Sequence, residues 1–183
     1  MKILTGALRG QSISFSPDPL LRPTTDKARK AIFDMLQGEL DGKTVLDLFS
    51  GTGALGFESL SQGASHVDFV EEDREQCQRI KGNLARWKFS GSVQVHAQDV
   101  ISWLSKNSKA PQVYDLIFLD PPYGTELAQA ALEKIGASQM IKKGGFVFVE
   151  CRKKVDIPPE CGGLKVVRDK RYGQTKVLVY RLF

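Results

Sequence analysis

The sequence predicts an α/β fold in which helices cover both faces of a mostly parallel sheet. Short apolar runs alternate with segments whose apolar residues repeat at helical spacing, which is typical of doubly wound parallel sheets. Only residues 169–175 separate the last two apolar runs, too few for a parallel crossover, so those strands must pair antiparallel. We therefore predict a sheet of seven strands, mostly parallel, that ends in a C-terminal antiparallel hairpin.

Residues 1–23 are predicted to form a basic hairpin or arm, because glycines interrupt a weak alternation and the prolines of residues 17–23 exclude a helix. Thr24 or Thr25 can cap a first helix, whose apolar residues repeat through Leu36. Strands are then predicted at residues 44–49, 66–71, 92–97, 113–119, 145–150, 164–168 and 176–180. Further helices are predicted at 54–60, from the second strand to about Trp87, from Val100 onward and at 125–135. No repeat or linker divides the chain, so residues 1–183 are predicted to form one domain.

The 183 residues are 42% apolar and 26% charged, which is ordinary for a soluble globular protein. Cys77, Cys151 and Cys161 show neither a CxxC pattern nor clustering with histidine, so no disulfide framework and no metal site are predicted. No apolar run has the length of a signal-peptide core or a membrane span. A cytoplasmic protein is the expectation.

The net charge of +5 is distributed unevenly along the chain. Lysine and arginine outnumber acids by six to two in residues 1–30 and by eleven to four in residues 142–183, whereas acids prevail by fifteen to nine between them. Basic ends around an acidic middle indicate a polyanion-binding surface built from the two termini. Lysines that only confer solubility are the alternative. The candidate phosphate contacts are Arg9, Arg29, Lys30, Lys170 and Arg171.

Asp120-Pro121-Pro122-Tyr123 follows the apolar run of the fourth predicted strand. Two prolines prevent the strand from continuing and a helix from starting at once. We therefore expect a stiff loop at the carboxyl end of a strand, where open α/β sheets bind their ligands. The loop offers a carboxylate, the carbonyl of Pro121 and an aromatic face, which suit a flat base with an amino group. A Pro-Pro pair that merely ends the strand is the other interpretation.

Gly51, Gly53 and Gly56 follow the first strand and match the G-x-G-x-x-G of dinucleotide sites, so an NAD enzyme is one hypothesis. Asp47, near the end of that strand, argues against it, because a carboxylate there would repel a pyrophosphate. It suits instead a ligand with a cationic ammonium group, such as the methionyl part of S-adenosylmethionine. Phe49, Gly51 and Gly53 are then candidate cofactor contacts, with the glycines letting the backbone pass close to the ligand.

Acids also end the second and third strands. Glu71 lies where an acid would bind ribose hydroxyls, about 20 residues after the glycines. Asp73 is predicted to cap the following helix, and Asp99 can either cap its own helix or accept from an adenine amino group. Because acids end strands one to four along one sheet edge, the set predicts an S-adenosylmethionine site. His66 and His96 fall in strands and are interpreted as structural.

With these pieces assembled, the sequence resembles the RsmD family of bacterial 16S ribosomal RNA guanine-N2 methyltransferases. The resemblance covers nearly the whole chain and is most specific at residues 22–29. The other segments that carry it are LDLFSGTGALGFESLSQGA, FVEEDR, FLDPPY and KRYGQTKVLVYRL. It implies a single-domain, Rossmann-like class I methyltransferase that transfers a methyl group from S-adenosylmethionine to the exocyclic amine of one guanine in 16S rRNA. Arg22 and Thr24 are candidate cofactor contacts. The sequence departs from the family pattern at Gln11, because a basic residue usually follows Arg9-Gly10. This difference is expected to weaken RNA binding by the arm.

The resemblance implies that 16S rRNA, within a small-subunit particle or assembly intermediate, is the partner, and no surplus amphipathic surface argues against a monomer. Asp120 and the Pro121 carbonyl would accept the N–H bonds of the target amine, and Tyr123 would stack on the base. A DNA adenine-N6 methyltransferase is an alternative, since the same loop serves that chemistry, but no segment is long enough for a separate target-recognition region. A non-catalytic RNA-binding factor with a vestigial pocket is the other alternative, although the glycine loop and Asp120 are intact.

Overall fold

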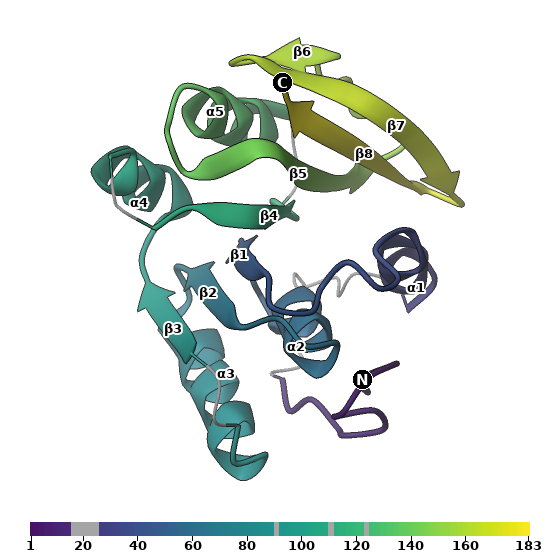
Figure 1. Ribbon diagram of the computed structural model, residues 1–183, viewed down its shortest axis with the longest axis vertical. Coiled ribbons are helices and arrows are strands. Elements are labelled where there is room, and N and C mark those ends of the chain that lie inside the picture. The colour runs from purple at the N-terminus through teal and green to yellow at the C-terminus, as the bar shows by residue number, and fades with distance from the viewer. Residues whose placement is uncertain (16–25, 90–91, 110–111, 123–124) are drawn as a thin grey trace.

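The computed structural model confirms the predicted α/β architecture, with one mixed sheet and helices on both of its faces (Figure 1). The structure describes residues 1–15, 26–89, 92–109, 112–122 and 125–183.

The sheet has eight strands among these residues, in the order β3-β2-β1-β4-β5-β8-β7-β6. Strands β1 to β5 are parallel, and β8 pairs antiparallel with both β5 and β7, as the short link near the C-terminus predicts. The strands are β1 Thr44–Leu48, β2 His66–Glu71, β3 Ser92–Ala97, β4 Tyr114–Leu119, β5 Ile141–Arg152, β6 Glu160–Cys161, β7 Leu164–Tyr172 and β8 Thr175–Leu182. Seven strands were predicted. The additional strand, β6, has two residues and is too short to show a period in the sequence.

Two groups of helices cover the two faces of the sheet. Helices α4 and α5 lie on one face, and α1, α2 and α3 lie on the other (Figure 1). Their bounds are α1 Asp26–Met35, α2 Ala54–Ser61, α3 Arg74–Arg86, α4 Val100–Asn107 and α5 Thr125–Gly136. The central strands are mostly apolar because successive side chains enter opposite cores: Leu46 packs beneath α4 and α5, and Val45 packs on the α2 side. In the described ranges no helix is both long and apolar enough to cross a membrane.

The register of the central strands brings their carboxyl ends to one edge. Leu48 of β1 is paired with Val70 of β2 and with Leu119 of β4. The residues that follow these strands therefore leave the sheet side by side. This edge holds the acids that the sequence predicts to surround a ligand.

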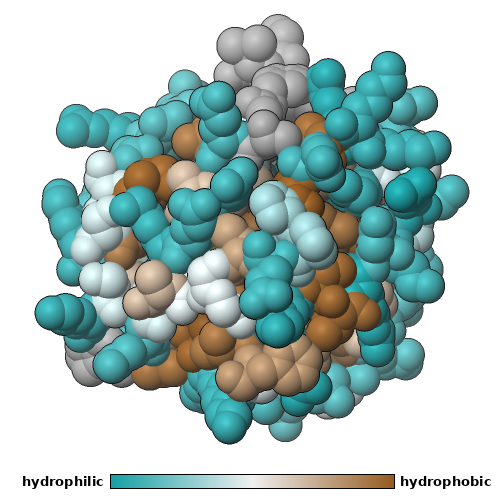
Figure 2. Space-filling model, turned by 90° about the horizontal axis from the view of Figure 1, so that it is seen from above, coloured by the Kyte–Doolittle hydropathy of each residue, from teal (hydrophilic) through white to brown (hydrophobic). Residues whose placement is uncertain are grey.

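The C-terminal hairpin is longer and tighter than predicted. Only Gly173 and Gln174 separate β7 from β8, and Gly173 has a positive φ of 62°, which a two-residue hairpin turn requires. Lys170 and Arg171, which were predicted to lie in the turn, belong to β7 itself. Hydrophilic side chains cover most of the face seen from the β6 side (Figure 2). The charged residues of β7 hinder pairing with another chain. Residues 169–172 extend the strand beyond the predicted residues 164–168, and they show no apolar alternation that would indicate a strand.

Residues 1–15 fold back on themselves and pack against α2 and α3. One antiparallel bridge joins Lys2 to Ser12, and Ile3 and Ile13 are buried. At Gly6, with φ of 76°, a Cβ atom would lie 1.9 Å from the carbonyl oxygen of Ser61, so only glycine permits this close approach. The predicted arm is therefore docked on the domain as far as residue 15, and the rest of it lies outside the described residues.

Candidate active site

Three carboxylates lie close together at the carboxyl edge of the sheet, one from each of three neighbouring strands. Asp47 is in β1, Glu71 ends β2, and Asp120 directly follows β4. Burial raises the pKa of Asp47 well above its usual value, and the negative charges of Asp120 and Glu71 raise it further. The Gly56 amide opposes this effect by donating a 2.9 Å hydrogen bond to the Asp47 carboxylate. The edge therefore concentrates negative charge that a cationic ligand would neutralise.

The loop between β1 and α2 has an unusual backbone that the glycines make possible. Phe49 has a positive φ of 57°, a conformation that costs energy for a residue with a side chain and is common at functional sites. Gly53 precedes α2 with φ of 75°, and its amide donates to the carbonyl of Ser50 at 2.7 Å. At Gly56 a Cβ atom would lie 2.2 Å from the ring of Phe69, so this glycine lets α2 pack closely on β2.

Glu71 bends back over this loop. Its Oε2 accepts a 2.8 Å hydrogen bond from the amide of Gly51, and its Oε1 accepts a 2.9 Å bond from the amide of Asp73. Asp73 caps α3, as predicted, by accepting from the amides of Glu75 and Gln76. The Glu71 carboxylate is thereby fixed beside the glycine loop, where the sequence predicts that it binds ribose hydroxyls.

Asp99 caps α4. Its Oδ1 accepts a 2.8 Å hydrogen bond from the amide of Ser102, and hydrogen bonds from Ser102 hold the pKa of Asp99 below its usual range. The cap that the sequence allowed is therefore present. A contact between Asp99 and an adenine amino group stays a prediction.

Asp120, the first residue after β4, still contacts the backbone of β1, and the two prolines after it end the pairing. The amide of Asp120 lies 3.5 Å from the carbonyl oxygen of Leu48, which holds the loop against β1. Asp120 and Pro121 are half-buried and Pro122 is exposed. Arg22, Thr24 and Tyr123, also predicted site residues, lie outside the described residues.

The predicted phosphate contacts divide into exposed and buried residues. Arg9, Lys30, Lys170 and Arg171 are exposed, and the Lys30 ammonium pairs with Asp34 at 2.7 Å. Arg29 corrects the prediction, because its side chain is fully buried and cannot reach an RNA phosphate from this position.

Arg29 instead ties the N-terminal segment to α1. Its guanidinium donates to the carbonyl of Lys2 and to Asp26, both at 2.8 Å, and lies 3.9 Å from the buried Glu58. Glu58 in turn accepts from the amides of Leu4 and Thr5. The helical spacing could have shown that Arg29 is buried, since it lies three and four residues before the buried Ile32 and Phe33. No sequence pattern indicated that Glu58 is its buried neighbour.

A second buried polar network lies away from the edge. Asp68 of β2 accepts hydrogen bonds from His66 at 2.8 Å, from His96 of β3 at 2.9 Å and from the hydroxyl of Tyr114 of β4 at 2.5 Å. The two histidines, interpreted as structural from the sequence, belong to this network, whereas no sequence pattern pointed to Asp68 or Tyr114. Among the described residues, no group of three His, Cys, Asp or Glu side chains has the arrangement of a metal site.

Comparison with known proteins places the whole chain in one group. The family model described as conserved hypothetical protein 95 matches residues 1–181. YlbH of Bacillus subtilis is 36% identical over 181 residues, which cover 99% of this chain and 98% of YlbH. Ribosomal RNA small subunit methyltransferase D of Haemophilus influenzae is 31% identical, with 100% of this chain and 93% of that protein covered. The solved structure of the yhhF protein of Escherichia coli is 28% identical, superposes with a TM-score of 0.85 and covers 100% of this chain and 97% of its own.

Proposed function

The chain belongs to the RsmD family, and on that premise we propose that it transfers a methyl group from S-adenosylmethionine to the exocyclic N2 amine of one guanine in 16S rRNA. The observation that carries the proposal is the convergence of Asp47, Glu71 and Asp120 at one edge of the sheet. Three mutually repelling carboxylates, one of them buried, fit a ligand that carries both a sulfonium and an ammonium charge.

The acids and the glycine loop would hold S-adenosylmethionine. Asp47 would stabilise the ammonium end, Glu71 would accept from the ribose hydroxyls, and Asp99 would accept from the adenine amino group. Phe49, Gly51 and Gly53 would form the wall along which the ligand lies. The cofactor supplies an already activated methyl group, so the protein has to supply placement.

The loop after β4 would place the acceptor. The exocyclic amine of guanine is a poor nucleophile because its lone pair is delocalised into the ring. Asp120 and the carbonyl of Pro121 can accept its two N–H bonds, which favours a pyramidal nitrogen with its lone pair directed at the methyl group. Pro121 contributes an acceptor without a competing N–H, and Asp120 can take the proton released after transfer. Correct orientation is the main requirement and can lower the barrier by many kcal/mol.

The target base must leave its stack or be unpaired to reach this loop. Unpaired bases are presented most readily by loops of structured RNA, where the exposed Arg9, Lys30, Lys170 and Arg171 could meet neighbouring phosphates. The proposed substrate is 16S rRNA within a small-subunit particle or an assembly intermediate, and the protein is proposed to act as a monomer.

One assay tests the proposal against its rivals. The protein is incubated with labelled S-adenosylmethionine and, separately, with small ribosomal subunits, naked rRNA, tRNA or DNA, and the methylated nucleoside is identified after digestion. N2-methylguanosine from the small subunit or its rRNA supports the proposal. N6-methyladenine from DNA would replace it with the DNA enzyme, and tight cofactor binding without transfer to any substrate would indicate a binding factor.

A further inference from the structure

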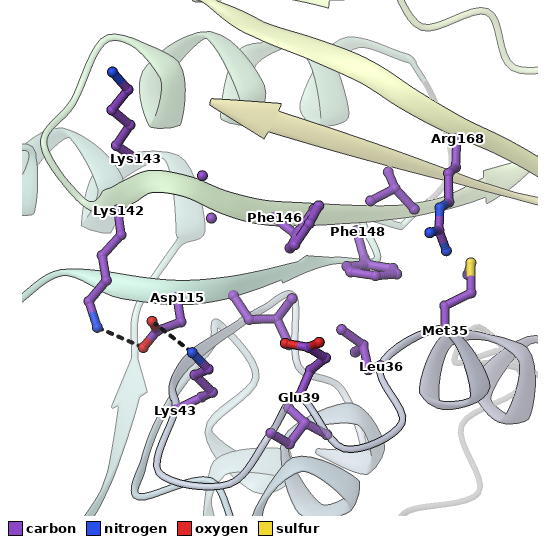
Figure 3. A pocket seen from close by; sticks show the side chains of 15 residues that line it. Met35, Leu36, Glu39, Lys43, Asp115, Lys142, Lys143, Phe146, Phe148 and Arg168 are labelled. Atoms are coloured by element: carbon purple, nitrogen blue, oxygen red, sulfur yellow. Dashed lines mark hydrogen bonds and ion pairs between the residues drawn. The ribbon is translucent and has the colours of Figure 1, made fainter. Parts of the chain in front are cut away.

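A groove of about 370 Å³ lies beneath the C-terminal end of α1, on the sheet face that α1 partly covers (Figure 3). It is bounded by the residues after α1, by the start of β5 and by β7 and β8. Asp115 lines it at the start of β4, whereas Asp120 follows the end of that strand. At about 3.3 Å per residue, Asp115 lies roughly 17 Å from Asp120 along the strand. Phe148, which is paired with Phe118, lines the end of the groove nearer to Asp120, so the groove runs along the sheet toward the methyl-transfer site.

Two phenylalanine rings of β5 form the floor of the groove. Phe148 is buried and packs against Phe118 with ring centroids 5.9 Å apart, so its position is fixed by the core. Phe146 is half-buried, and the guanidinium of Arg181 lies 5.4 Å from its ring centroid. Figure 3 shows both rings directed into the groove from the same strand. A floor of this kind offers flat apolar area to a planar ligand.

Basic side chains surround this floor. Lys43 and Lys142 lie on one side, where Asp115 pairs with both at 3.8 and 2.8 Å, respectively. Arg168 of β7 lies on the other side and directs its guanidinium toward Met35 (Figure 3). Arg181 adds a further cation beside the groove, against the acids Glu39 and Asp115, whereas Lys143 directs its ammonium away from the groove (Figure 3). The rim therefore has an excess of positive charge.

We propose that this groove binds an unpaired segment of the substrate rRNA that flanks the target guanine, with a base on the Phe146 ring and phosphates at Arg168 and Lys43. Aromatic rings within a cationic groove are the features by which proteins hold single-stranded nucleic acid, since every base can stack and every phosphate is an anion. Other ligands would use only part of this groove. A small anion would not contact the aromatic rings, and an apolar peptide would not pair with the basic side chains. This inference rests on the proposed function, because it names a second contact of the same substrate.

The test compares two double charge reversals. Arg168→Glu with Lys43→Glu alters the groove, and Lys106→Glu with Lys109→Glu makes the same change in charge on exposed lysines of α4 and the turn after it, on the opposite sheet face. We measure binding of an unpaired rRNA oligonucleotide at several salt concentrations, kcat and KM for small subunits, and the Kd for S-adenosylmethionine. If the charge-reversal variant does not fold, the neutral variant Arg168→Gln with Lys43→Gln is measured in its place.

We expect the groove variant to bind the oligonucleotide at least tenfold more weakly and to raise KM for small subunits by a similar factor, with unchanged kcat and cofactor Kd. The slope of log K against log salt should become shallower by about 0.7 for each phosphate that the variant no longer binds. The α4 control should stay within about twofold of the parent. Phe146→Leu should weaken oligonucleotide binding by at least fivefold through loss of stacking, with a salt slope like that of the parent.

Equal losses in the groove and α4 variants would overturn the inference, since they would reflect overall charge. Wild-type affinity in the groove variant would also overturn it while leaving the proposed function intact. A loss confined to assembled particles, with naked RNA unaffected, would assign the groove to a ribosomal protein and reject the RNA contact. Oligonucleotide binding is measured without methyl transfer, so the groove is tested even if the wild type methylates no RNA.

Discussion

Asp47 and Asp68 are both buried carboxylates, but their surroundings act on them in opposite directions. Asp68 accepts hydrogen bonds from two histidines and a tyrosine, and these bonds lower its pKa although burial alone would raise it. Asp47 has one backbone donor and two acidic neighbours, and burial raises its pKa. The fold stabilises the charge of Asp68 internally, whereas no such set of donors offsets the burial of Asp47. This contrast supports the proposal that Asp47 binds a ligand and that Asp68 is structural.

We therefore predict that Asp47→Asn stabilises the protein and weakens cofactor binding. The raised pKa means that the folded state is penalised once pH exceeds the ordinary aspartate pKa of about 3.9, and the full penalty applies above the folded-state pKa. Asparagine can still accept from the Gly56 amide but carries no charge. The free energy of unfolding should rise by on the order of 1 kcal/mol at pH 7.5, and this gain should vanish at acidic pH.

Thermal unfolding at pH 7.5 and 4 and titration with S-adenosylmethionine check this expectation, with Tm rising by about 2–4 °C for each kcal/mol. Asp34→Asn, at an exposed carboxylate of α1, is the matched control and should change neither quantity appreciably. Loss of stability in the Asp47 variant would show that its carboxylate is structural.

Asp120→Ala should separate transfer from cofactor binding. The side chain is proposed to accept from the target amine and to take its proton, so kcat should fall by at least 100-fold. Cofactor affinity should stay within a few-fold, because Asp47 and Glu71 remain. Single-turnover transfer and equilibrium titration of S-adenosylmethionine measure the two effects separately. Equal losses in transfer and cofactor affinity would assign Asp120 a structural role.

At the scale of elements, the Asp68 network joins β2 to its neighbour β3 and to β4, which lies beyond β1 in the sheet. Removal of the tyrosine hydroxyl in Tyr114→Phe should lower the free energy of unfolding by about 1.5–3 kcal/mol near pH 7, since the lost bond ends on a charged group. Asp68 has a lowered pKa, so its stabilisation is present above its unfolded-state pKa and is lost as pH falls through its folded-state pKa. The deficit of the variant should therefore shrink below about pH 4. Urea unfolding of the wild type and the variant from pH 3 to 7 measures this loss of stability. A loss that does not depend on pH would show that the charge of Asp68 does not contribute to it.

The N-terminal segment and α1 depend on one buried cation. Arg29→Ala removes the donors to Lys2 and Asp26 and leaves the buried Glu58 without its nearby positive charge. We expect a loss of about 3–5 kcal/mol in unfolding free energy, together with faster amide exchange in residues 2–14. Lys30→Ala, at the exposed neighbouring position, is the control and should stay within about 0.5 kcal/mol. An Arg29 variant of normal stability but poor RNA binding would restore the sequence-based interpretation.

At the scale of the whole molecule, the fold was predictable because its signals are local and repeated. Strands β1, β2 and β4 are mostly apolar runs, each with a helical pattern after it, and the tail has too short a link for any pairing other than antiparallel. The failures have equally specific causes. Arg29 was assigned by charge although its helical position is buried, β6 has only two residues, and residues 169–172 of β7, beyond the predicted strand, are too polar to show an apolar alternation. The α1 groove joins segments far apart in the sequence, so no local pattern could reveal it.

Helix α1, from the basic N-terminal part of the chain, packs against β8 of the basic C-terminal part (Figure 1). If the basic side chains of these two parts bind the phosphate backbone, RNA affinity and cofactor affinity should respond differently to salt. Each phosphate contact with a single strand contributes about −0.7 to the slope of log K against log salt. S-adenosylmethionine lacks phosphates and is proposed to bind among partly buried acids, where salt screens less. We therefore expect KM for small subunits to rise at least tenfold between 50 and about 200 mM salt, while the cofactor Kd changes less than about twofold. Parallel salt series of methyl transfer and cofactor titration measure both. If neither KM for small subunits nor the cofactor Kd changes appreciably with salt, the basic termini confer solubility and do not bind the substrate.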